Sequence, residues 1–153
     1  MLQAAYLAVM NGMTEIAVTA ADAGDTACDR LRRFIVANVT PPVTDSRTLS
    51  LWAAFISHIQ TDQTFAAIHR ENYLAFLTAL EVLVADFFDE RGTPVSEKEN
   101  RSFAISLNAL IDGLWLEGTL TSDLFAENEL ADSALASVEA LLRLKPGELA
   151  SER

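Results

Sequence analysis

The fold is decided by residues 96–116, SEKENRSFAISLNALIDGLWL. Ser96 followed by Glu99 is the pattern of a capping box, in which side chains at a helix start satisfy the first free backbone N–H groups. Apolar residues then recur at the three- and four-residue spacing of a single helix face: Phe103, Leu107, Leu110 and Leu114. This stretch therefore predicts a helix from about Ser96 to Leu116.

The rest of the chain has the composition of further helices. Ala and Leu dominate, and the alternation of β-branched residues that is typical of strands is nearly absent. Helix breaks are expected at residues 23–25, with Asp25 as an N-cap, at Pro41-Pro42, at residues 61–62, at Gly92 and in a polar loop at 118–128. We therefore predict an all-α fold, a single bundle of about six helices that occupies residues 1–153. The expected helices before residue 96 are at about 2–19, 25–40, 46–59 and 62–90.

Charge and cysteine content exclude several classes of protein. The chain has 22 acidic and 11 basic residues and a formal net charge of −11, which argues against a stand-alone nucleic-acid binder. Its single cysteine, Cys28, can form neither an intramolecular disulfide nor a multi-cysteine zinc site. The start of the chain lacks the basic residues of a secretory signal, and no apolar run reaches the length of a membrane span. We therefore expect a cytoplasmic protein without membrane contact.

The sequence offers no convincing catalytic set. Neither His58 nor His69 belongs to a Glu-x-x-His pair, so the di-iron bundle pattern is missing from the sequence. There is also no P-loop, no His-Glu-x-x-His zinc motif and no nucleophile elbow. We therefore expect no enzymatic activity, no metal and no cofactor.

The helix at 96–116 has a second apolar side, nearly opposite the first. It carries Ile105, Ala109 and Leu116, and the small residues Ser106 and Gly113 lie beside them. A helix that is apolar on both sides is covered on both sides. One side can meet the protein's own core, and the other meets either another internal helix or a partner subunit. Because homodimers are the commonest soluble assemblies, the sequence favours the partner.

A third stripe on the same helix consists of Asn108, Asp112 and Trp115. A carboxylate in an apolar stretch is costly unless it is paired, and the simpler interpretation is that Asp112 accepts a bond from an arginine or a backbone group. The functional interpretation is a site for a cationic ligand, since carboxylates and aromatic faces both attract amines. Further aromatic walls could come from Trp52, Phe55, Tyr73 and Phe76, although core packing is the simpler role for each.

Two segments resemble a known family. LWAAF at 51–55 and ALIDGLWL at 109–116 are similar to segments of TetR-family transcriptional regulators, especially the BetI-type repressors of choline-to-betaine pathways. The resemblance implies an effector-binding domain, with a choline-like amine as candidate effector, that forms a homodimer through its last two long helices. On these helices the expected interface residues are Ile105, Ser106, Ala109, Gly113, Leu116, Leu135, Val138 and Leu142.

The resemblance also implies a separate helix-turn-helix domain that binds DNA. Nothing in the 153 residues matches that domain, and residues 1–21 resemble the helix that connects it to the effector domain. The chain would then reach DNA only through a domain outside this sequence. Two alternatives are a headless protein that forms heterodimers with a full-length regulator, and a small helical carrier or enzyme with an apolar pocket.

Overall fold

The computed structural model describes residues 1–150 of the chain, and in this range the protein is helical without any β-strand. The elements are α1 (Leu2–Asp22), α2 (Ala27–Asn38), α3 (Ser46–Ile56), α4 (Gln63–Glu90), α5 (Glu97–Leu120), the short 3-10 helix η1 (Ser122–Leu124) and α6 (Glu129–Leu141). The all-α prediction is confirmed, and the six α-helices follow the expected order.

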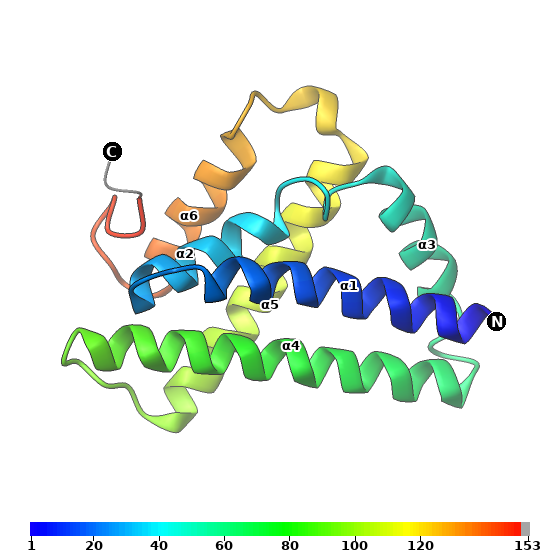
Figure 1. Cartoon of the computed structure of the whole chain (residues 1–153), viewed down its shortest axis with the longest axis horizontal. Helices are drawn as coiled ribbons and strands as arrows, with labels where there is room; N and C mark the ends of the chain where they lie inside the picture. Colours follow the sequence, from blue (N-terminus) through cyan, green and yellow to red (C-terminus); the bar gives the residue numbers. More distant parts are fainter. Residues whose placement is uncertain (151–153) are drawn as a thin grey trace.

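The helices form a bundle in which the longest members cross (Figure 1). α1 and α4 run alongside one another in the same direction, and α5 crosses behind them. α3 lies near the N-terminal end of α1, whereas α2 and α6 lie toward the opposite end. α2 contacts α1, α4, α5 and α6, and α3 contacts α1 and α5. The bundle therefore has two ends, one built around α2 and α6 and the other around α3.

The starts of α2, α3, α4 and α5 are capped by polar side chains that accept backbone N–H groups. The hydroxyl of Ser96 accepts the N–H of Glu99 at 3.3 Å, as the capping-box pattern predicts. The second helix is capped by Thr26, whose hydroxyl accepts the N–H of Asp29 at 3.0 Å, and not by Asp25 as predicted. Both residue types are good N-caps, so the sequence alone could not choose between adjacent candidates.

Two helix ends differ from the prediction. α3 stops at Ile56, before the expected end near residue 59, where the chain turns and the carbonyl of His58 accepts the N–H of Asp62 at 2.8 Å. α5 continues to Leu120, beyond the expected end near residue 116. Gly118 lies inside this extension and is buried against Leu130, whose side chain occupies the space that a Cβ at position 118 would need. This glycine therefore permits close packing of α5 against Leu130 at the start of α6.

The main core lies at the α2 and α6 end. Every α-helix except α3 contributes buried apolar residues to it. The core includes Leu31, Phe34, Ile35, Leu80, Val84, Phe87, Leu107, Val138, Leu142 and Leu149. Two of these, Val138 at 0% and Leu142 at 2% exposure, were expected on the dimer interface. Their side chains pack inside this chain and offer no surface to a partner, so that expectation is wrong for both. A helix buried in its own subunit produces the same apolar spacing as an interface helix, which explains the error.

The C-terminal segment is tied to this core by a buried carboxylate. The Glu139 side chain accepts the backbone N–H of Gly147 at 2.8 Å and that of Leu149 at 2.7 Å. These two bonds satisfy a charge that would otherwise be costly to bury. They hold Leu149 in the main core.

No helix within residues 1–150 combines the length and the apolar character that spanning a membrane requires.

Candidate functional site

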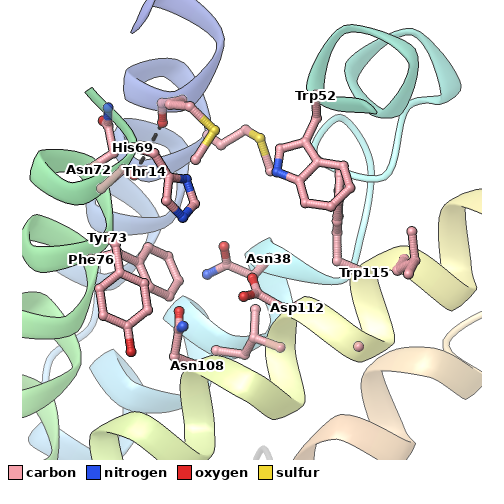
Figure 2. A pocket seen from close by; sticks show the side chains of 15 residues that line it. Thr14, Asn38, Trp52, His69, Asn72, Tyr73, Phe76, Asn108, Asp112 and Trp115 are labelled. Carbon is pink, nitrogen blue, oxygen red and sulfur yellow. Dashed lines mark hydrogen bonds between the residues drawn. The ribbon is translucent and has the colours of Figure 1, made fainter. Parts of the chain in front are cut away.

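A cavity of about 340 Å³ lies between α1, the end of α2, α3, α4 and α5 (Figure 2). The residues that line it are Met10, Met13, Thr14, Asn38, Trp52, His69, Asn72, Tyr73, Phe76, Asn108, Ile111, Asp112, Gly113, Trp115 and Leu116. The volume is at the small end of the range of roughly 300–1,000 Å³ that is usual for small-molecule pockets. The cavity therefore fits a small organic molecule.

Most of the residues predicted to bind a ligand line this cavity. They come from α3, α4 and α5 and are Trp52, Tyr73, Phe76, Asn108, Asp112 and Trp115. Phe55 is the exception, because it is 0% exposed and its ring packs against Tyr6 at 4.7 Å between ring centroids and against Phe65 at 6.1 Å. Phe55 therefore belongs to a small aromatic cluster beside the cavity, and its proposed role as a cavity wall is wrong.

Other lining residues were not predicted as ligand contacts. Asn38 and Asn72 are polar residues inside otherwise apolar helix faces, and that is the signal by which they could have been found. Met10, Met13 and Thr14 come from α1, and nothing in their spacing separates a cavity wall from core packing. Gly113 and Leu116, which were expected at the dimer interface, also line the cavity. The exposed side of α5 and the cavity wall therefore share these two residues.

Asp112 is the carboxylate of the cavity. It keeps solvent-accessible surface and lines the cavity, while the surrounding protein removes enough water to raise the pKa of its carboxyl to about 6. Within residues 1–150 no arginine, lysine or backbone N–H pairs with this carboxylate. The structural alternative, in which Asp112 is satisfied by a neighbouring group, is therefore not realised in this part of the chain. At neutral pH the carboxylate is mostly ionised.

Three asparagines add neutral polar groups to the wall. The amide nitrogen of Asn38 donates to the carbonyl of Phe34 at 2.8 Å, and that of Asn72 donates to the carbonyl of Ile68 at 2.9 Å. Both bonds link a side chain to the helix turn before it and so fix the orientation of the amide. Asn108 lies one helical turn before Asp112 on α5, and both point into the same part of the cavity (Figure 2).

His69 contributes a neutral imidazole. Its Nδ1 lies 3.0 Å from the hydroxyl of Tyr6, and burial lowers the pKa of the ring below its usual value. The ring is therefore uncharged at pH 7. Among the described residues that line the cavity there is no lysine or arginine, so the charge of the wall is negative.

Two tryptophans form one corner of the cavity. The rings of Trp52 and Trp115 meet edge to face, with centroids 5.4 Å apart and an interplanar angle of 77°. The indole N–H of Trp115 donates to the carbonyl of Val43 at 2.8 Å, which holds the ring in place. This corner is a rigid aromatic surface joined to a carboxylate on the same helix, a combination that attracts cations.

A metal site is not evident in residues 1–150, where no group of three or more His, Cys, Asp or Glu side chains is placed to hold an ion. The hydrogen bonds of the described lining residues include no pair of nucleophile and base.

Comparison with known proteins found a match to one family and one solved structure. The model of the family "BetI-type transcriptional repressor, C-terminal" matches residues 27–143. The structure described as "the putative transcriptional regulator from Pseudomonas aeruginosa PAO1" is similar with a TM-score of 0.84 and 26% sequence identity, over 96% of this chain and 69% of that chain. No curated protein matches the chain.

Proposed function

Because the chain belongs to the family of C-terminal domains of BetI-type transcriptional repressors, we propose that it is the effector-binding and dimerisation part of a TetR-like regulator. The observation that carries the proposal is the cavity of about 340 Å³ that contains the carboxylate of Asp112. An ionised, unpaired carboxylate that is partly withdrawn from water is costly for folding alone. Binding of a ligand that neutralises the carboxylate would explain why this costly arrangement is present.

The effector that fits the cavity is a small organic cation. Asp112 supplies a negative charge in a site with little water, where attraction for a cation is stronger than at the protein surface. The faces of Trp52 and Trp115 add cation–π attraction and apolar contact. A ligand with an anionic group would meet the Asp112 carboxylate without a lysine or arginine among the lining residues to offset it.

α1 connects the cavity with the rest of the regulator. This helix lines the cavity with Met10, Met13 and Thr14, and it packs on both α2 and α4. We assign residues 1–21 the role of a connecting helix to a helix-turn-helix domain outside these 153 residues. An effector that binds one position of α1 more tightly than another shifts the population toward that position. The affinity of the regulator for DNA would then depend on which position α1 occupies.

The proposed dimer surface is the exposed side of α5. Ile105 and Ala109 are exposed, Ser106 and Leu116 are half-buried, and a Cβ at Gly113 would meet nothing within 4 Å. On α6, Leu135 is half-buried at the edge of the main core. Exposed apolar residues beside small ones allow two copies of a helix to approach closely, which supports a homodimer.

Sedimentation of the 153-residue chain tests the dimer. We expect a dimer at micromolar concentration that persists in high salt, because the surface is apolar. Ile105→Glu should produce a folded monomer, whereas Val82→Glu, at an exposed valine on α4, should leave the dimer intact. A wild-type chain that sediments as a monomer would overturn the dimer proposal.

Tryptophan fluorescence and thermal shift test the effector proposal. Small amines, choline and betaine aldehyde should be titrated against the wild-type chain, with a neutral alcohol of similar size as the uncharged control. We expect a cation to change the fluorescence, and Asp112→Asn to weaken its binding at least tenfold. Glu117→Gln, an exposed acid on the same helix outside the cavity, should bind like wild type. The proposal fails if no organic cation changes either the fluorescence or the melting temperature.

A further inference from the structure

The polar side chains around Asp112 discriminate among cations. We propose that the cavity selects a protonated primary or secondary amine, which has N–H donors, over a quaternary ammonium ion of the same size. This inference rests on the proposed function, in which the cavity binds an organic cation. It identifies the chemical class of that cation.

The cavity wall supplies hydrogen-bond acceptors from asparagine side chains. Asn38 is 4% exposed and Asn72 is 7% exposed, and both line the cavity. Each uses its amide nitrogen to donate to a carbonyl of its own helix, at 2.8 Å and 2.9 Å respectively. The amide oxygens have no hydrogen-bond partner within residues 1–150. Neither oxygen is fully enclosed by protein, so each keeps surface on which it can accept a hydrogen bond from a bound molecule.

Acceptors from two helices lie close together beside Asp112. Asn38 from α2 and Asn108 and Asp112 from α5 converge on the same part of the cavity (Figure 2). Asn72 lines another part of the cavity, on α4 beside α1 (Figure 2). An ammonium group can donate up to three hydrogen bonds, so a carboxylate and neighbouring amide oxygens can satisfy it from different directions.

A quaternary ammonium ion can use only part of this wall. A quaternary ammonium ion would gain the charge of Asp112 and the faces of Trp52 and Trp115. It has no N–H group, however, so its methyl groups would cover the amide oxygen of Asn38 beside Asp112 without bonding to it. Loss of a hydrogen bond between a charged donor and a buried acceptor typically changes affinity about tenfold or more. The amide oxygens therefore decide between the two classes.

Four ligands with the same aromatic body and the same charge test this selection by isothermal titration of the wild-type chain. They are phenethylamine, its N-methyl and N,N-dimethyl derivatives, and its N,N,N-trimethyl derivative. We expect affinity to fall at least tenfold from the primary amine to the trimethyl ion. The N-isopropyl derivative has the same number of heavy atoms as the trimethyl ion but keeps two N–H groups, and it should bind more tightly than the trimethyl ion. This isomer separates hydrogen bonding from size.

Variants locate the source of the preference. Asn38→Leu should reduce the ratio between the amine and the trimethyl ion, whereas Asp112→Asn should weaken both ligands. Asn11→Leu, at an exposed position on α1, is the matched control. If a variant does not fold, the ratio between the two isomers in the wild-type chain decides the question.

The outcomes separate this inference from the proposed function. If the trimethyl ion binds as tightly as its N-isopropyl isomer or more tightly, the selection is overturned and cation binding stands. If no member of the series binds, this inference falls, and the proposed function falls with it only if small amines, choline and betaine aldehyde also fail to bind.

Discussion

The two ends of the bundle use their helices differently. At the α2 and α6 end, large apolar side chains fill the space between helices, and Phe34, Phe87 and Leu107 have almost no exposed surface. At the α3 end the same helices α4 and α5 enclose a cavity of about 340 Å³ with a carboxylate and three asparagines in its wall. The chain thus places its stability and its candidate binding site in separate parts of the same long helices.

This difference explains why α4 and α5 carry both kinds of residue. Toward one end of α4 the inward side chains are Leu80, Val84 and Phe87, and toward the other they are His69 and Asn72. A polar wall reduces the apolar area that a helix can bury, so the packed end must supply more of the stability. The following substitutions test that division, from the largest expected effect to the smallest.

The largest effect is expected from Phe87→Ala at the packed end. Removing this ring from a full core should lower the free energy of unfolding by about 3–5 kcal/mol. Met13→Ala at the cavity end removes a half-buried side chain that already borders open space, and should lower it by about 1 kcal/mol or less. Urea unfolding followed by circular dichroism measures both values. Equal losses would show that the two ends do not differ in their contribution to stability.

A smaller effect, with the opposite sign, is expected from Asp112→Asn. Burial raises the pKa of Asp112 from 3.8 to about 6, so the folded state favours the protonated carboxyl. Its contribution to stability is fully present below pH 4 and is lost as the pH rises through about 6. Removing the charge should therefore stabilise the ligand-free protein at pH 7.5 by about 1 kcal/mol, a value reduced for the partial exposure of the residue.

The pH dependence of melting provides the control for this prediction. Asp112→Asn and wild type should have similar melting temperatures below pH 4 and should diverge between pH 4 and 6.5. His69 is the other titratable group in the cavity wall, and it is present in both proteins. A gap between the two melting temperatures that stays constant over this pH range would argue against a raised pKa at Asp112.

The smallest effects are expected at two helical glycines. Gly12 on α1 has nothing within 4 Å of a Cβ, so Gly12→Ala should stabilise the protein by about 0.5–1 kcal/mol through helix propensity. At Gly118 a Cβ would collide with Leu130. The cost of this collision should exceed the gain in helix propensity, so Gly118→Ala should destabilise the protein by about 0.5 kcal/mol. Thermal unfolding of the two variants measures the contrast. If Gly118→Ala stabilises the protein as much as Gly12→Ala, the close packing of α5 on Leu130 does not limit which side chain position 118 can carry.

The sequence predicted the helices well because their signals are local. The capping pair Ser96 and Glu99 and the apolar spacing after it depend only on neighbouring residues, and they define the start of α5. The end of α5 depends on Leu130, which reaches Gly118 only in the folded chain. A glycine in a polar stretch reads as a break, so the prediction stopped the helix too early.

Residues of the candidate site could be predicted where a polar side chain interrupts the apolar periodicity of its helix. Asp112 stands out because an acid in an apolar stripe needs an explanation. Phe55 and Val138 could not be placed by this argument, since an aromatic or branched residue has the same spacing whether it packs in the core, lines a cavity or meets a partner. That distinction depends on which helices lie opposite, and only the fold supplies it.

The contact between Trp52 and Trp115 also gives the protein a built-in optical reporter. They are the two tryptophans of the chain, and both line the cavity. Because Trp115 is held by the carbonyl of Val43, a change in their near-ultraviolet signal reports motion of α3 relative to α5. Binding, the movement of α3 and the rate of either can therefore be followed in the unlabelled protein.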